Sequence, residues 1–317
     1  MEYCFDPEIN MMMRELPEKT LELDLSDPVA CRSTLESFAS AIEVDFSGVQ
    51  VTNEIIESEL DGHEVPIRIY TPKQLKRKSA GLIHLHGGGF VIGSLDPEQA
   101  TCASLCKELG IVVISVGYRL APEHPYPSGL NDCYATLIWV SDSADNLLID
   151  RNRLGIYGLS AGGGLCAALA LLSRDRSGPP ICFQYLGIPE LDDRLNTLSM
   201  QQFSDTPIWN QELAEISWRY YLGDAYTPGD DDVPIYASPS RAKDLRGLPR
   251  TYISTMEFDP LRDEGILYAL KLMQEGVQTE LHSFPGTFHG SHFFAEAKIN
   301  QRAHEETIRV LKNGLAL

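Results

Sequence analysis

The stretch Leu154-Gly-Ile-Tyr-Gly-Leu-Ser160-Ala-Gly-Gly-Gly-Leu165 decides the fold of this 317-residue chain. It runs from a short apolar segment, Leu154–Tyr157, through Gly158-Leu159-Ser160-Ala161-Gly162 into an apolar helical pattern that ends near residue 174. A serine between two such glycines, at a junction of strand and helix, is typical of a sharp turn that presents the serine hydroxyl as a nucleophile. The helix behind Ser160 would add backbone N–H groups and the positive end of its dipole.

Short apolar runs and helical patterns alternate on both sides of this stretch. A hairpin is expected first, with strands at 52–58 and 65–71 around Asp61-Gly62. Further buried strands are predicted at Leu82–Leu85, Ile111–Val116, Leu154–Tyr157, Ile181–Leu186, Thr251–Thr255 and Thr279–Phe284, and helices at 97–109, 128–140, 161–174, 260–275 and 292–313. This alternation predicts an α/β fold with a mostly parallel central sheet and helices on both faces.

Two regions, residues 1–45 and 192–225, fall outside the alternation. Insertions that follow strand ends in an α/β protein lie over the edge of the sheet where ligands bind. We therefore expect these regions to form a helical cap over a core made of residues 46–191 and 226–317. The run Met11-Met12-Met13 either lines this cap with adaptable apolar side chains or takes part in ordinary helix packing.

Composition limits the classes of partner. The chain has 26 basic and 45 acidic residues, a formal net charge of −19, and residues 1–62 hold fifteen acidic residues against three basic ones. Such a surface repels nucleic-acid phosphates and anionic lipid head groups, so we expect neither nucleic acid nor membrane as a partner. The seven cysteines form no C-x-x-C pattern, and the acidic N-terminus does not look like a signal peptide. These features favour a protein of the reducing cytoplasm.

A glycine-rich segment, His86-Gly87-Gly88-Gly89-Phe90, directly follows the predicted strand Leu82–Leu85. Successive glycines let the backbone turn its amides toward a developing oxyanion, and the expected donors are the N–H groups of Gly88, Gly89 and Ala161. A flexible loop or a phosphate cradle is the alternative interpretation. No Gly-Lys-Ser/Thr follows the segment and no G-x-G-x-x-G is formed, so the sequence offers little support for a nucleotide cofactor.

Four ordered motifs together resemble the hormone-sensitive-lipase-like branch of the α/β-hydrolases, over nearly the whole chain. They are His86–Phe90, Tyr118–Glu123 with Pro125 and Pro127, Gly158–Gly163, and Asp259–Gly265. The resemblance implies a capped α/β-hydrolase that cleaves short-chain carboxylic esters without a cofactor or metal. Members of this branch are often dimers, which implies a homodimer here.

A serine nucleophile needs a base and a group that orients the base, and in this fold the chain order is Ser, then Asp or Glu, then His. Asp259 lies just beyond the strand Thr251–Thr255, at the same sheet edge as Ser160, and it also suits an N-cap position before Pro260. Asp263 would lie a turn further inside the following helix, and Glu257 comes a residue or two earlier, so both fit this role less well. The family motif selects Asp259.

His289 is the expected base. It follows the strand Thr279–Phe284 after a short Pro285-Gly286 turn, and Gly290 beside it matches the His-Gly of the family. The glycine-segment residue His86 shapes that loop in the family. The remaining candidates lie within a predicted strand or in the predicted last helix: His282, His292 and His304.

Other charged motifs are interpreted as structural. Arg119, Glu123 and Asp132 are expected to pair with one another and to hold the proline-rich loop, while Asp230-Asp231-Asp232 fits a solvated loop better than a metal site. The chain departs from the family pattern at Leu159, at Ile188 and at Ser291, which concerns the acyl pocket and the cap and leaves the expected site residues intact.

The resemblance and the site residues together predict a serine carboxylesterase with a small-molecule ester as substrate. Ser160 would attack the ester carbonyl, His289 would transfer the proton, and Asp259 would orient the imidazole. An amide or N-acetyl hydrolase on the same residues and a non-catalytic small-molecule receptor are the alternatives. The dimer is expected through the strand Thr279–Phe284 and the last helix, and the acidic front segment is expected to disfavour anionic esters.

Overall fold

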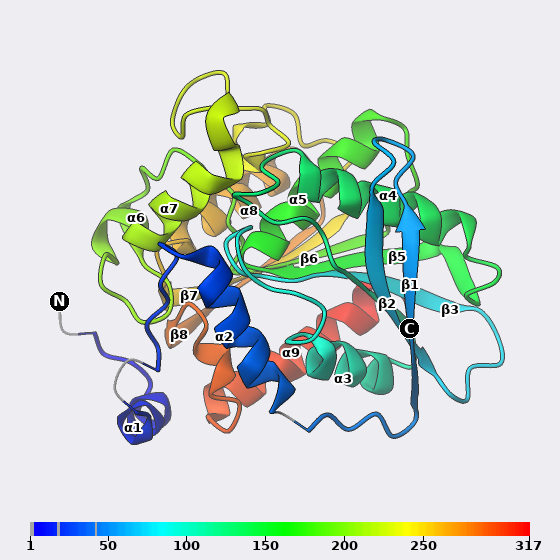
Figure 1. Cartoon of the computed structure of the whole chain (residues 1–317), viewed down its shortest axis with the longest axis horizontal. Coiled ribbons are helices and arrows are strands. Elements are labelled where there is room, and N and C mark those ends of the chain that lie inside the picture. Colours follow the sequence, from blue (N-terminus) through cyan, green and yellow to red (C-terminus); the bar gives the residue numbers. More distant parts are fainter. Residues whose placement is uncertain (1–2, 18–19, 42) are drawn as a thin grey trace.

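A twisted eight-stranded sheet forms the centre of the computed structural model, which describes residues 3–17, 20–41 and 43–317 (Figure 1). The strand order is β1-β2-β4-β3-β5-β6-β7-β8. The strands are β1 Val49–Glu57, β2 Glu64–Pro72, β3 Ser79–Leu85, β4 Val112–Val116, β5 Ile149–Leu159, β6 Phe183–Gly187, β7 Arg250–Phe258 and β8 Thr279–Phe288. Only the pairs β1–β2 and β2–β4 are antiparallel, and every other neighbouring pair is parallel. The prediction of a mostly parallel sheet is confirmed.

Helices cover both faces of the sheet, as the alternating sequence predicts (Figure 1). The helices α4 Ser128–Asp142, α5 Ala161–Asp175 and α8 Arg262–Gln274 pack on one face, and α3 Gln99–Leu109 and α9 Lys298–Gly314 pack on the other. Helix α5 is apolar all round because it lies between the sheet and its neighbouring helices, and its residues from Ala161 to Ser173 are all buried. Full burial of a leucine such as Leu169 stabilises the fold by about 2 kcal/mol relative to exposure.

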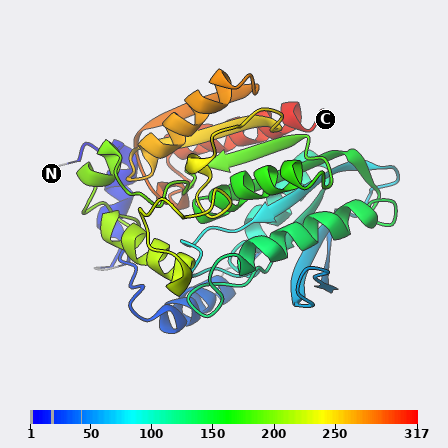
Figure 2. The ribbon, with the colours of Figure 1, turned by 90° about the horizontal axis from the view of Figure 1, so that it is seen from above.

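The two regions outside the alternation are mainly helical and pack together at one end of the sheet (Figure 2). Helices α1 Pro7–Glu15 and α2 Pro28–Ser40 come from the first region, and α6 Leu198–Gln202 and α7 Gln211–Leu222 from the second. The N–H of Ile208 donates to the carbonyl of Leu21 at 2.9 Å, which joins the regions directly. Three short 3₁₀ turns complete the described chain, at Gly223–Ala225, Pro239–Arg241 and Ser291–Phe293.

The C-terminal part differs from the sequence prediction in two places. The last helix begins at Lys298 and not at residue 292, because the Asn300 side chain binds the carbonyls of Ser291 and Phe294 and holds the preceding residues in a turn. The strand expected to end at Phe284 continues to Phe288, since Pro285-Gly286 is accommodated inside β8 beside a register shift in its pairing with β7.

Two further features concern the redox state of the cysteines and the possibility of a membrane-spanning helix. All seven cysteines are free thiols. No helix in the described ranges is both long enough and apolar enough to cross a membrane.

Candidate active site

Ser160 occupies a tight turn between β5 and α5. Its backbone has φ 56° and ψ −125°, a conformation that non-glycine residues adopt only under constraint. The flanking glycines are required by contact: a Cβ at Gly158 would lie 2.3 Å from the backbone of Gly162, and one at Gly162 would lie 2.1 Å from the carbonyl oxygen of Leu85. The Ser160 N–H donates to Gly187 O at 2.8 Å. The turn is therefore held by a hydrogen bond to the end of β6 and by close packing against the end of β3.

Ser160, His289 and Asp259 form one hydrogen-bonded line. His289 Nε2 lies 2.9 Å from Ser160 Oγ, and His289 Nδ1 lies 2.8 Å from Asp259 Oδ2. All three side chains are buried. They come from the carboxyl ends of β5, β7 and β8, so the parallel sheet brings together residues that are far apart in the sequence. This arrangement is the one a serine needs for proton transfer to an oriented imidazole.

Asp259 uses its two carboxylate oxygens for two different contacts. Its Oδ2 faces His289, while its Oδ1 accepts a hydrogen bond from the Leu261 N–H at 2.8 Å, just before α8. The other two carboxylates considered have different partners. Asp263 accepts a hydrogen bond from the Ser199 N–H, and Glu257 accepts one from the Gly286 N–H.

The three glycine carbonyls of the glycine-rich segment each have a polar partner other than Ser160. Gly87 O lies 2.8 Å from His86 Nδ1, Gly88 O accepts from the N–H groups of Val91 and Ile92, and Gly89 O accepts from Ser217 Oγ at 2.7 Å. The N–H groups of Gly88 and Gly89 have no hydrogen-bond acceptor among the described residues. Two backbone donors, one half-buried and one buried, are thus left available in the loop next to Ser160.

Among the described residues, the other candidate histidines make no hydrogen bond to this line. The His86 ring is buried and stacks on Tyr118 at 4.1 Å between centroids, and burial lowers its pKa to about 4. Burial also lowers the pKa of His292 to about 4, and this residue lies in the 3₁₀ turn rather than in the last helix as predicted. His304 does lie in the last helix, where it contacts Glu108. The prediction for His292 is wrong because the last helix starts later.

Residues 82–293 match the model of a family described as alpha/beta hydrolase fold, so two thirds of the sequence and the whole of the Ser160 geometry fall within it. The chain belongs to this family.

Several esterases are similar to this hydrolase. The carboxylesterase NlhH of Mycobacterium tuberculosis is 37% identical over 232 residues, which are 73% of this chain and 72% of the relative. The arylesterase of Saccharolobus solfataricus is 36% identical over 239 residues, 73% of this chain and 74% of the relative. Among solved structures, a bacterial heroin esterase has a TM-score of 0.94 and 46% identity and covers 98% of both chains. The resemblance seen in the four motifs is confirmed.

The charged residues of the proline-rich loop pair only partly as predicted. Arg119 binds Asp132 at 2.7 Å and also reaches Asp61, so this pair is confirmed. Glu123, in contrast, pairs with Arg32 at 2.8 Å. The prediction that Glu123 joins the other two is wrong, because α2 of the first region lies against the loop and supplies a closer cation.

Sequence reasoning missed the contacts that the two helical regions make with the glycine-rich loop. Arg32 of α2 donates from Nε to Val91 O and from Nη2 to Ala121 O, both at 2.7 Å. The Tyr221 ring of α7 stacks on Phe90 at 3.9 Å between centroids. No pattern in the sequence links these positions, since each pair is separated by between 59 and 131 residues.

An indole ring lies close to both His289 and the glycine-rich loop in this hydrolase. The Trp209 and His289 rings lie 5.8 Å apart, and a Cβ at Gly89 would lie 2.4 Å from the Trp209 ring.

Ser291 stands where the family pattern has an aromatic residue. Its hydroxyl accepts a hydrogen bond from the Phe288 N–H. This bond closes the turn that carries His289.

Proposed function

We propose that this chain is a serine carboxylesterase that hydrolyses short-chain carboxylic esters through an acyl-enzyme intermediate. The observation that carries the proposal is the continuous line from Ser160 Oγ through the His289 imidazole to Asp259, at distances of 2.9 and 2.8 Å. Relatives named carboxylesterase, esterase and arylesterase support an ester as the substrate.

In the proposed reaction Ser160 Oγ attacks the ester carbonyl and gives its proton to His289 Nε2. Asp259 stabilises the imidazolium through Nδ1–H and fixes the ring in the tautomer that leaves Nε2 free to accept. The imidazolium then protonates the departing alcohol, which leaves an acyl-serine. A water molecule activated by the same imidazole attacks the acyl-serine, and the carboxylic acid is released.

The N–H groups of Gly88, Gly89 and Ala161 are proposed to stabilise the oxyanion of both tetrahedral intermediates. The N–H groups of Gly88 and Gly89 make no hydrogen bond within the described residues, and their carbonyls bind other groups, which supports this assignment. Loss of one such donor typically costs about 10²–10³ in kcat. The regions 1–45 and 192–225 are proposed to form the cap above these groups.

The test compares Ser160→Ala with a matched control, Ser104→Ala on helix α3, whose hydroxyl contacts only Glu108. With p-nitrophenyl esters from acetyl to decanoyl, Ser160→Ala is expected to lose at least about 10⁴ in kcat/KM while the control keeps wild-type values. A preference for short acyl chains is expected. Wild-type turnover by Ser160→Ala contradicts the proposal.

An amide or N-acetyl hydrolase is the second candidate, and one similar protein favours it: the arylacetamide deacetylase of Bos taurus is 31% identical and covers 82% of this chain and 80% of its own length. Measuring kcat/KM for an ester and an anilide with the same acyl group separates the two. A ratio of ester to anilide kcat/KM near one or below supports the amide hydrolase.

A non-catalytic receptor is the remaining alternative. It predicts that an organophosphate leaves no covalent label on Ser160, and mass spectrometry tests this.

The cellular setting and assembly are proposed as a cytoplasmic homodimer. Seven free thiols support a reducing compartment, and β8 is an edge strand that can face a second copy together with α9. Cell fractionation and light scattering at micromolar concentration test these points. A monomer by light scattering contradicts the dimer.

The substrate is proposed to be a neutral ester. Residues 1–62, which include α1 and α2 of the proposed cap, hold fifteen acidic residues against three basic ones. An ester that bears a carboxylate would be repelled there. Matched neutral and succinyl esters test this, and a preference for the succinyl ester contradicts it.

A further inference from the structure

A second buried carboxyl group, that of Glu190, lies behind the glycine-rich loop and takes no part in the proposed proton transfer. Glu190 follows β6, and its side chain is fully buried. Its backbone N–H donates to the Ser160 carbonyl at 3.1 Å, which ties this residue to the same turn as the proposed nucleophile. Its Oε2 has no hydrogen-bond partner among the described residues.

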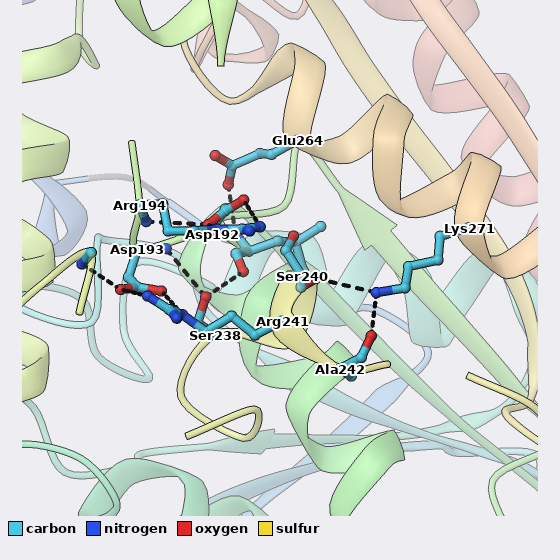
Figure 3. Close-up of polar contacts among 11 residues, drawn as sticks. Asp192, Asp193, Arg194, Ser238, Ser240, Arg241, Ala242, Glu264 and Lys271 are labelled. Carbon is cyan, nitrogen blue, oxygen red and sulfur yellow. Dashed lines mark hydrogen bonds and ion pairs between the residues drawn. The ribbon is translucent and has the colours of Figure 1, made fainter. Parts of the chain in front are cut away.

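The chain around Glu190 is held rigidly on its far side. Figure 3 shows Asp192 and Asp193 facing the guanidinium groups of Arg194 and Arg241, with Asp193 bound to Arg241 at 2.6 Å. The Leu191 N–H donates to the carboxyl group of Glu264 at 2.6 Å. Because the residues just after Glu190 are anchored in this way, its side chain cannot leave the loop without breaking several buried bonds.

Ser217 has one hydroxyl proton and two acceptors within reach, which indicates that Glu190 is protonated. Ser217 Oγ on α7 lies 2.7 Å from Gly89 O and 3.2 Å from Glu190 Oε1. A hydroxyl group has one proton to donate, and the shorter contact takes it. The contact with Glu190 is then a hydrogen bond only if the carboxyl group is protonated and donates to Ser217 Oγ.

The surroundings favour the same state. The ionisable groups that face Glu190 are Asp259 beyond β7, Glu264 on α8 and Tyr221 on α7, and none of them is a cation. Burial, with the charge of Asp259, raises the pKa of Glu190 to about 8. The residue is therefore neutral over the acidic and neutral range and ionises in mild alkali.

We propose that protonated Glu190 is a positioning residue for the oxyanion site, which acts by donating to Ser217 so that Ser217 donates to Gly89 O. The Gly89 carbonyl and the Gly89 N–H, one of the proposed oxyanion donors, flank the same Cα, so holding the carbonyl limits the rotation of the backbone that carries the donor. An ionised Glu190 accepts the Ser217 proton instead and releases Gly89 O. The inference rests on the proposed function, since it deepens the role of the same site.

The first test compares the pH dependence of kcat for the wild type and Glu190→Gln with a short p-nitrophenyl ester. Glutamine can donate to Ser217 Oγ at every pH and so imitates the protonated acid. We expect wild-type kcat to decline in alkali around the Glu190 ionisation. Glu190→Gln is expected to keep kcat within about twofold of the wild type at neutral pH and to lack the alkaline decline, up to about pH 10.

Glu264→Gln is the matched control. Glu264 is equally buried, but it binds the Leu191 N–H and has no contact with the glycine-rich loop. It is expected to keep the alkaline decline. Retention of the decline in both glutamine variants, or its loss in both, overturns the proposal. Ser160→Ala run beside them separates this failure from failure of the esterase proposal, because only the latter leaves turnover independent of Ser160.

Ser217→Ala gives an independent readout if Glu190→Gln does not fold. Removing the hydroxyl releases Gly89 O at every pH, so kcat is expected to fall at least about tenfold with KM within about twofold. What remains is expected to lack the alkaline decline. Wild-type kcat with an unchanged decline in Ser217→Ala overturns the proposal.

Discussion

The clamp that Arg32 forms between α2 and the core can be broken with a single substitution, Arg32→Met. The guanidinium donates to the carbonyls of Val91 and Ala121, each at 2.7 Å, and both of these residues are buried. It also binds both carboxylate oxygens of Glu123 at 2.9 and 2.8 Å. Methionine keeps the apolar stem of the side chain and removes every one of these bonds.

The expected loss follows from the exposure of each partner. The two carbonyls are left without their donor in a buried setting, which costs about 1–1.5 kcal/mol each. The pair with Glu123 adds only about 0.5 kcal/mol, because 43% of the Glu123 side chain is exposed and solvent screens the charges. The sum is about 3 kcal/mol of unfolding free energy. Since Val91 follows the proposed oxyanion loop, kcat is expected to fall about tenfold as that loop loosens.

Urea unfolding and ester turnover measure both effects, with Arg246→Met as the control. Arg246 also binds a carboxylate through two nitrogens, that of Asp244, but its side chain is 72% exposed. The control should leave the unfolding midpoint and kcat at wild-type values. Equal effects from the two substitutions, or a stable Arg32→Met variant with full turnover, refute the reasoning that α2 is docked through these carbonyls.

Three further outcomes are expected. Gly162→Ala should prevent soluble expression or lower the melting temperature by more than about 10 °C. The new Cβ would lie 2.1 Å from the carbonyl oxygen of Leu85, which is backbone and cannot move aside. Thermal unfolding followed by circular dichroism measures the effect. Folding raises the pKa of Glu190 from 4.5 to about 8, so between these pH values the folded state binds one proton more than the unfolded state. The unfolding free energy of the wild type should therefore fall, relative to that of Glu190→Gln, by about 1.4 kcal/mol for each unit that the pH rises in this range. A flat or rising difference in urea titrations contradicts this. Asp259→Asn should lower kcat by about 10³–10⁴ with an unchanged melting temperature, as measured with a p-nitrophenyl ester. The asparagine oxygen must stay on the Leu261 N–H, which turns the amide NH₂ toward His289 and forces the wrong imidazole tautomer.

Most of the sheet could be predicted because its strands are buried on both faces. In β4, for example, all five residues are buried, so the strand appears in the sequence as a continuous apolar run. The turn at Ser160 could be predicted as well. Backbone segments approach each other so closely at positions 158 and 162 that only glycine fits, and the two glycines are present in the sequence. Such features are local or concern one residue type, and a single sequence carries them.

The parts that could not be predicted depend on which surfaces meet. The sequence places Arg119, Glu123 and Asp132 close together along the chain, but it gives no sign that Arg32 arrives from α2 and takes Glu123 as its partner. The start of the last helix also differs from the prediction, because the Asn300 side chain binds carbonyls that would otherwise continue the helical pattern.

The same reasoning explains why Glu190 and Ser217 escape notice in the sequence although they lie so near Ser160. A glutamate in a loop and a serine in a helix are ordinary surface residues by composition, and only burial makes them unusual. Once α7 covers the glycine-rich loop, the Gly89 carbonyl must find a donor inside the protein, and Ser217 supplies it. Ser217 in turn needs a donor for its oxygen, which only a protonated Glu190 can give at that distance. Packing of α7 over the glycine-rich loop therefore requires a buried protonated acid. The pH sensitivity proposed for this hydrolase follows from this packing and not from the Ser160–His289–Asp259 line.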